Sequence, residues 1–215
     1  MKIIYLYKKF KADLADTRQN SPKFDLVLHL KMWVSEYILR LDTVNAGYMW
    51  TSYPLHQFLH SLNLKNKNIL EFGSGGSTVF FLKRKANLIT FEHSQIWIEK
   101  LRLRLENQST WQPYLVEYIC RQDDQNGYLK YIEKIQDIED ETLDIALVDG
   151  RHRVECVRAV QSKLVPGGKI ILDDSDRPSY EESYEILKNW ETFRISGYAY
   201  MSDYKTHSTV WQKPS

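Results

Sequence analysis

Residues 68–94, NILEFGSGGSTVFFLKRKANLITFEHS, determine the expected fold. The stretch holds an apolar run with Glu71 near its end, three glycines that follow, and a second apolar run that ends in Glu92. These runs predict a strand over 68–72, a helix over 77–85 and a strand over 87–92. A strand, a helix and a second strand in this order form a crossover between parallel neighbours in a sheet.

The same alternation continues through most of the chain. Further strands are predicted over 114–120, 143–149 and 168–174, and further helices over 94–108 and 153–164. The tail, residues 193–215, holds two strand-like runs without a helix between them, which predicts an antiparallel hairpin at the sheet edge. We therefore expect an α/β fold, a Rossmann-like, doubly wound and mostly parallel sheet of seven strands.

Two helices are expected before the first strand. Apolar residues recur at helical spacing over 21–41, with Ser21 as the N-cap, and a second helix is predicted over 52–63. We divide the chain into an N-terminal helical extension or lid, residues 1–62, and a main domain, residues 63–215. The helices allow either a lid or a homodimer interface. The aromatic residues among them allow either a cover for a ligand or core packing; they are Tyr48, Trp50 and Tyr53.

Composition restricts the class of protein. The 215 residues are 43% hydrophobic, which suits one sizeable core. Lys and Arg total 29 against 28 for Asp and Glu, so the net charge of +1 predicts neither nucleic acid nor a membrane as partner, and only a local cluster would change that expectation. Cys120 and Cys156 lie in apolar contexts without paired spacing, which predicts buried thiols. With no signal peptide or membrane-spanning run in the sequence, we expect a cytoplasmic protein.

The glycine-rich turn is the first candidate site. In a doubly wound sheet, ligands bind beyond the carboxyl ends of the strands where the strand order reverses. Glycines there let a ligand approach the backbone, and Glu92, about 20 residues further on, suits ribose hydroxyls. A pyrophosphate disfavours a carboxylate such as Glu71 beside the turn, so a ligand with an amine or another cation is expected rather than NAD. A tight turn without any ligand is the alternative.

Two segments carry a family resemblance. EFGSGGS at 71–77 resembles the first motif of class I S-adenosylmethionine-dependent methyltransferases, and ITFEH at 89–93 resembles their second-strand motif. The resemblance implies S-adenosylmethionine as cofactor, with Glu92 on the ribose and His93 beside the adenosine, unless His93 is only a surface residue. It also implies an adenine contact from Asp123 or Asp124, unless these are solvated loop acids. The residues implied at the methionine end are Glu71, Gly73, Ser74, Gly75, Gly76 and Ser77.

A second constellation is acidic. Asp149 ends the fourth predicted strand, and Asp173 with Asp174 ends the fifth. Clustered carboxylates repel unless a cation or proton neutralises them, and the candidates are the sulfonium of the cofactor, which would make Asp149 a cofactor contact, or Mg²⁺. The layout resembles metal-dependent O-methyltransferases, which implies all three aspartates as metal ligands and His152 as general base beside a catalytic Asp149. Helix capping and loop hydrogen bonds are the alternative for the aspartates, and a surface position at a helix start is the alternative for His152.

Arginines surround these acids. VDGRHRVECVRA at 148–159 and DDSDRPSY at 173–180 are similar to a group of uncharacterised bacterial methyltransferase-like proteins, over roughly residues 45–185. The arginines and a nearby tyrosine predict an acceptor with an anionic group, or else internal salt bridges. These residues are Arg151, Arg153, Arg177 and Tyr180.

The resulting hypothesis is a bacterial, cytoplasmic methyltransferase that methylates a hydroxyl of a small-molecule or glycan-linked acceptor. VDGRH departs from the segment typical of DNA amino-methyltransferases, and the balanced charge gives no nucleic-acid footprint. A non-catalytic module that binds a nucleoside or a partner protein is the alternative, because a fold does not imply an activity.

Overall fold

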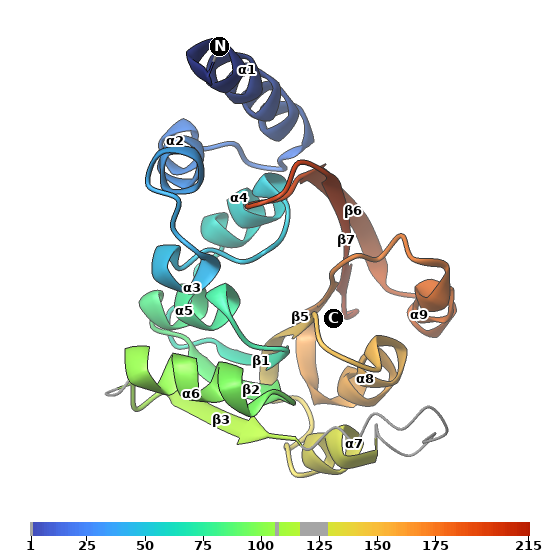
Figure 1. Ribbon diagram of the computed structural model, residues 1–215. Coiled ribbons are helices and arrows are strands. Elements are labelled where there is room, and N and C mark those ends of the chain that lie inside the picture. The colour runs from blue at the N-terminus through green and yellow to red at the C-terminus, as the bar shows by residue number, and fades with distance from the viewer. Residues whose placement is uncertain (1, 106–107, 117–128) are drawn as a thin grey trace.

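The computed structural model describes residues 2–105, 108–116 and 129–215, and within these ranges seven strands form one sheet (Figure 1). The strand order is β3-β2-β1-β4-β5-β7-β6, in which β7 runs antiparallel to both of its neighbours and the other pairs are parallel. The strands are β1 (Asn68–Phe72), β2 (Asn87–Glu92), β3 (Trp111–Leu115), β4 (Leu143–Val148), β5 (Leu164–Leu172), β6 (Glu191–Tyr198) and β7 (Lys205–Gln212). The predicted fold class, including the antiparallel edge hairpin, is confirmed.

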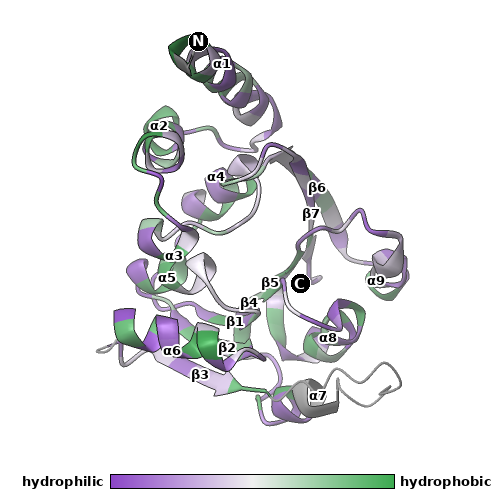
Figure 2. Cartoon of the chain, viewed as in Figure 1, coloured by the Kyte–Doolittle hydropathy of each residue, from purple (hydrophilic) through white to green (hydrophobic). Residues whose placement is uncertain are grey.

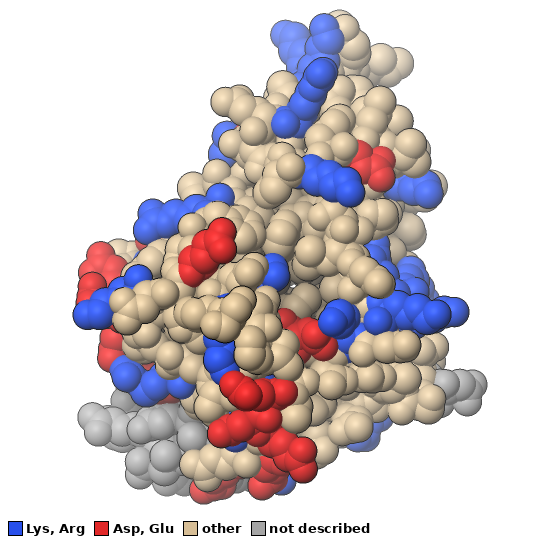
Figure 3. Space-filling model, turned by 180° about the vertical axis from the view of Figure 1, so that it is seen from behind, with Lys and Arg blue, Asp and Glu red and all other residues tan. Residues whose placement is uncertain are grey.

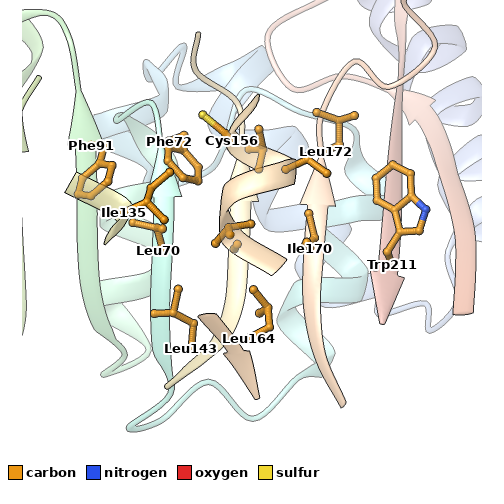
Figure 4. Close-up of a cluster of buried hydrophobic side chains, with 14 of the residues drawn as sticks. Leu70, Phe72, Phe91, Ile135, Leu143, Cys156, Leu164, Ile170, Leu172 and Trp211 are labelled. Atoms are coloured by element: carbon orange, nitrogen blue, oxygen red, sulfur yellow. The ribbon is translucent and has the colours of Figure 1, made fainter. Parts of the chain in front are cut away.

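Both faces of the sheet are covered, because side chains of the central strands alternate between two cores. Leu70 and Phe72 point into one core, where α8 contributes Cys156 (Figure 4), and Ile69 points into the other, where α5 contributes Phe80. The first core is covered by α7 (Leu129–Gln136), α8 (Arg153–Val160) and α9 (Glu181–Ile186), and the second by α4 (Tyr53–Ser61) and α5 (Gly76–Lys83), beside which lies α6 (Gln95–Arg104). Burial raises the pKa of the Cys156 thiol, as expected for an inert core cysteine, whereas Cys120 lies outside the described residues.

The third strand begins earlier than predicted. The sequence indicated a strand over 114–120, but β3 starts at Trp111 and includes Pro113, and residues 117–120 lie outside the described ranges. Proline lacks the backbone donor that an interior strand needs, and β3 tolerates it because it lies at the edge of the sheet.

The N-terminal segment is helical, as predicted, and the helix predicted over 52–63 is α4 with Ser52 as its N-cap, but the helices before it start elsewhere. They are α1 (Lys2–Asn20), α2 (Leu26–Trp33), the π-helical turn η1 (Val34–Ile38) and the short α3 (Thr43–Ala46). The prediction of Ser21 as N-cap is wrong: the Asp25 carboxylate accepts the backbone N–H groups of Val27 and Leu28, and Gln57 on α4 fixes the Asp25 backbone with two hydrogen bonds. Tertiary contact with α4 therefore selects the helix start.

The helices that precede the sheet are packed against it. Tyr53, 1% exposed, and Tyr200 share a core with Met32 and Trp33 of α2, and Ser35 Oγ lies 3.0 Å from the Tyr200 hydroxyl. Leu55 and other side chains of α4 belong to the core of the sheet itself. Of the three aromatic residues singled out in the sequence, Tyr53 is thus core and Tyr48 packs beside it, whereas Trp50 is 60% exposed.

The segment after α3 contacts α5 at Gly76, the first residue of that helix. A Cβ atom at Gly76 would lie 1.8 Å from the Tyr48 carbonyl oxygen, a backbone atom that cannot rotate away. We expect Gly76→Ala to lower the free energy of unfolding by about 2–4 kcal/mol. Urea denaturation followed by circular dichroism measures this loss.

Gly75→Ala is the matched control, since no heavy atom lies within 4 Å of a Cβ at that neighbouring position. Its loss of stability is expected to be clearly smaller. Equal losses in the two variants would contradict the described packing of Tyr48 on α5.

Candidate functional site

A cavity of about 450 Å³ opens at the carboxyl ends of β1 and β4, where the strand order reverses. It brings together most of the residues that the sequence predicted. The lining comprises Thr43, Met49, Trp50, Thr51, Leu55, Gly73, Ser74, Gly75, Gly76, Ser77, Glu92, His93, Trp97, Leu147, Asp149, Gly150, Arg151, Arg153, Asp173 and Arg177. Four predicted residues do not line it, namely Glu71, His152, Asp174 and Tyr180, and the predicted adenine contacts Asp123 and Asp124 lie outside the described residues.

The glycine turn between β1 and α5 forms one wall. Gly73 has a φ of +89°, and a Cβ there would lie 2.9 Å from the Asp149 carbonyl oxygen, so the ends of β1 and β4 approach closely only because this residue is glycine. Gly75 differs, since a Cβ there would meet no heavy atom within 4 Å. Its missing side chain leaves open space beside the turn, and Gly75 itself lines the cavity.

Glu71 lies beneath the turn, fully buried, and contacts no part of the cavity. Its Oε1 accepts the hydroxyls of Thr78, at 2.5 Å, and Thr90, at 2.7 Å, and the Thr78 oxygen in turn accepts the Gly75 N–H. Burial raises the pKa of Glu71 to about 7, although the two threonine hydroxyls oppose the rise. Glu71 therefore links β1, β2 and α5 and positions the turn from below.

Glu92 ends β2 at the cavity, in an environment that favours its charged form. Oε2 accepts the Ser74 N–H and hydroxyl, both at 2.7 Å, and Oε1 accepts the N–H groups of His93 and Ser94. Burial opposes ionisation, but the hydrogen bonds from His93, Ser74 and Ser94 outweigh it and hold the pKa of Glu92 at about 2. His93 stays beside this carboxylate, with Nδ1 3.0 Å from Oε1.

Arg153, on the first turn of α8, is the centre of the acidic constellation. Its guanidinium lies 2.8 Å from Asp149 Oδ1 and 3.8 Å from Asp174 Oδ2, and it donates to the backbone oxygens of Asp173 and Gly150. Tyr180 lies under the same group, with its ring centre 5.4 Å from the Arg153 guanidinium carbon. The cation that neutralises the aspartates is therefore a side chain of the chain itself.

The prediction of a metal site formed by Asp149, Asp173 and Asp174 is not supported. No group of three or more His, Cys, Asp or Glu in the described part of the chain is placed to hold a metal ion. Asp173 Oδ1 instead accepts the hydroxyls of Thr51 and Ser208, and Asp174 pairs with Arg177. With Arg153 between the carboxylates, a divalent cation would meet a positive charge, so this donor set does not suit Mg²⁺.

Two aspartates line the cavity, and Asp149 is the exposed one, with 41% of its side chain exposed, whereas Asp173 is buried. Partial burial and the neighbouring carboxylates of Asp173 and Asp174 raise the pKa of Asp149, while Arg153 opposes the rise. His152 has a left-handed backbone with a φ of 48°, its Nε2 is buried, and its side chain does not line the cavity. The two residues that flank it, Arg151 and Arg153, do line the cavity.

Several residues at the site were missed in the sequence. Thr51 and Ser208 donate their hydroxyls to Asp173, and Trp97 on α6 lines the cavity. Ser202 accepts the indole N–H of Trp50, the aromatic residue already singled out in the sequence, at 2.9 Å. Ser208 and Ser202 lie far along the chain from the motifs, so spacing carried no signal for them. Trp97 offered one, because it stands near the start of a helix that follows directly on Glu92.

Several solved structures have a fold similar to that of this chain. Precorrin 8W decarboxylase from Methanobacterium thermoautotrophicum matches with a TM-score of 0.55 at 17% identity, over 75% of this chain and 90% of that chain. Aeropyrum pernix fibrillarin, with natively bound S-adenosyl-L-methionine, matches with a TM-score of 0.51 at 16% identity over 73% and 71%. The tRNA (m1A58) methyltransferase TrmI from Aquifex aeolicus matches with a TM-score of 0.51 at 17% identity over 78% and 71%.

No protein-family model and no curated protein sequence matches the chain. The resemblance to class I S-adenosylmethionine-dependent methyltransferases is confirmed at the level of the fold. At such low identities the likeness extends to the fold alone, and the three names include a decarboxylase as well as a methyltransferase.

Glu71 makes stability depend on pH in a direction that can be tested. Its pKa is raised from 4.5 to about 7 on folding, so the folded state binds the proton more tightly, and stability is full below pH 4.5 and falls as pH rises to about 7. The loss amounts to about 3 kcal/mol. We expect Glu71→Gln, which keeps an acceptor for the two threonines, to remove this part of the pH dependence in urea denaturation between pH 5 and pH 8. An unchanged pH profile in the variant would show that Glu71 is ionised throughout.

Proposed function

We propose that the chain is an S-adenosylmethionine-dependent methyltransferase that methylates a hydroxyl of a small-molecule or glycan-linked acceptor. The observation that carries the proposal is the cavity at the strand-order reversal, which joins an open glycine turn to an ionised acid at the end of β2. The similar fold of fibrillarin, which was solved with this cofactor, supports the choice of ligand.

The residues present fit the cofactor. Gly75 leaves its side-chain space free beside the turn, and Glu92 offers a carboxylate for ribose hydroxyls. A carboxylate has about four acceptor positions, and three donors to Glu92 are backbone N–H groups, which cannot turn away. The side-chain groups beside the carboxylate are the Ser74 hydroxyl at Oε2 and the His93 ring at Oε1. We assign the Ser74 hydroxyl, which rotates about a single bond, as the donor that a ribose hydroxyl replaces.

The hydrogen bonds that Glu92 already accepts also support the alternative function, a non-catalytic module. Glu92 is satisfied by the chain itself, so a purely structural acid at the end of β2 is consistent with a non-catalytic module. Such a module would retain the fold and bind a nucleoside or a partner protein without turnover. Cofactor binding and methyl transfer distinguish the two functions.

When bound, the cofactor supplies an electrophilic methyl group on its sulfonium. We assign Asp149 as the general base that takes the proton of the acceptor hydroxyl, because its carboxylate is exposed and lines the cavity. His152 was the other candidate, and its position outside the cavity lining favours Asp149. Arg153 would hold Asp149 in place through the helix-start ion pair.

The arginines of the cavity differ in how exposed their guanidinium groups are and in how many contacts within the chain these groups make. Arg153 is 8% exposed and is engaged by Asp149 and two backbone oxygens. Arg151 is exposed and forms no ion pair with any described residue, and Arg177 is half-exposed beside Asp174. We therefore assign Arg151 and Arg177 to an anionic group of the acceptor, with Trp50 and Trp97 as ring surfaces at the cavity wall.

Gly75 gives the sharpest test of the cofactor site. We expect wild-type protein to bind S-adenosylhomocysteine in isothermal titration, Gly75→Ala to bind it more weakly, and Gly75→Val to lose at least about tenfold in affinity, because the added side chain enters the cavity. Urea denaturation of each variant separates a filled cavity from a damaged fold.

Ile96→Val on α6, 78% exposed and outside the cavity lining, is the control. Wild-type protein that does not bind S-adenosylhomocysteine would overturn the proposal. Binding that is unaffected by Gly75→Val would place the ligand elsewhere.

A further inference from the structure

Exposed apolar side chains are concentrated in the first forty residues. Of the eighteen large apolar residues that are exposed in the described ranges, ten lie between Ile3 and Leu39. Figure 2 shows apolar segments on α2 and at the amino-terminal end of α1, at one end of the molecule. We call the outward side of α1, α2 and η1 the N-terminal face.

The most continuous part of this face is a ridge along α2 and η1. Its residues are 39–59% exposed and recur at helical spacing; they are Leu26, Val27, Leu30, Val34 and Ile38. The opposite side of α2 is already used, because Met32 and Trp33 pack against Tyr53 and Tyr200. The ridge therefore cannot turn inward, and the helix is apolar on both sides.

The charges of the same segment are separated by sign. The exposed basic residues are Lys8, Lys11, Arg18, Lys23, Lys31 and Arg40. The acids Asp13 and Asp16 are buried on the inner side of α1, and Glu36 is half-buried against the Tyr53 hydroxyl. Asp25 is the only exposed acid from residue 3 to residue 41, and it caps α2. In Figure 3, Lys and Arg side chains stand out over this end of the molecule.

A second copy of the chain does not suit such a face. In a two-fold dimer the same patch meets itself, so the six exposed basic residues of one copy would approach those of the other with Asp25 as the only exposed acid of residues 3–41 to pair with. Lysine is also depleted from protein interfaces.

An anionic bilayer suits the face in both respects, because exposed apolar residues enter the headgroup boundary while Lys and Arg contact the charged lipids. No helix among the described residues is long and apolar enough to span a membrane, so the contact would be with the surface. The net charge of the whole chain, +1, conceals this local excess. We propose that the N-terminal face docks on anionic lipid membranes, with the ridge of α2 and η1 at the headgroup boundary and the basic residues of both helices around it.

Vesicle sedimentation of the full chain tests the proposal. We expect binding to phosphatidylcholine vesicles that contain about 30% phosphatidylglycerol, little binding to phosphatidylcholine alone, and release at about 0.5 M NaCl. Val27→Gln with Ile38→Gln is expected to weaken binding at least about tenfold, because both side chains are more than half exposed and belong to the ridge. Lys8→Glu with Lys11→Glu is expected to weaken it by a similar factor.

The matched control is Ile96→Gln with Leu103→Gln on α6, which removes two more strongly exposed apolar side chains outside the face. Equal weakening by this control and by the ridge variant would overturn the proposal, as would an absence of binding to anionic vesicles. A lipid-free dimer in light scattering that Val27→Gln with Ile38→Gln dissociates would assign the ridge to a second copy instead. All of these proteins are sufficiently stable for the comparison if their urea midpoints match the wild type.

Discussion

The guanidinium of Arg153 holds the carboxyl ends of β4 and β5 together. Three aspartates converge there, and carboxylates that lie close together repel one another unless a positive charge lies between them. Arg153 contacts the side chain of Asp149, lies 3.8 Å from that of Asp174, and donates to the Asp173 backbone at 2.6 Å. Removing the buried Arg153 would leave the Asp149 carboxylate without this compensating charge. The ion pair with Arg153 also holds the Asp149 carboxylate at the cavity, so the charge of this part of the lining depends on one residue.

Glu71 and Glu92 show how the same residue type acquires opposite properties in one site. Both lie near the ends of neighbouring strands and both are buried, but Glu71 accepts side-chain hydroxyls, among them those of Thr78 and Thr90, while Glu92 accepts three backbone N–H groups and a hydroxyl. The pKa of Glu71 is therefore raised by burial, whereas the hydrogen bonds lower that of Glu92 against the same effect. The difference gives each a separate part: Glu71 shapes the turn from inside, and Glu92 presents charge at the cavity wall.

The fold and most of the cavity lining were predictable from the sequence because they depend on local patterns. Apolar runs, glycines and strand ends put the turn, Glu92, Asp149 and Asp173 at one edge. The predicted metal site is not supported, and residue types alone do not show where an arginine side chain points, although Asp149 and Arg153 are four residues apart at a helix start. Strand alternation could also have predicted the orientation of Glu71. Glu71 lies on the same face of β1 as Ile69, under α5, and so points away from a ligand. Thr51 and Ser208 approach Asp173 through tertiary packing, which no spacing records.

The N-terminal helices carry apolar residues on two opposite sides. Their inner sides must complete the core around Tyr53 and Tyr200, which uses the apolar residues of α2 that an isolated amphipathic helix would present outward. Nevertheless the outer side carries a second apolar ridge and six exposed cations. Folding alone gains nothing from the exposed part of that outer ridge, 39–59% of each residue, since this surface stays in contact with water. The segment that follows α2 supplies Thr43, Trp50 and Thr51 to the cavity, so whatever binds the outer side lies close in the chain to the residues that border the candidate site.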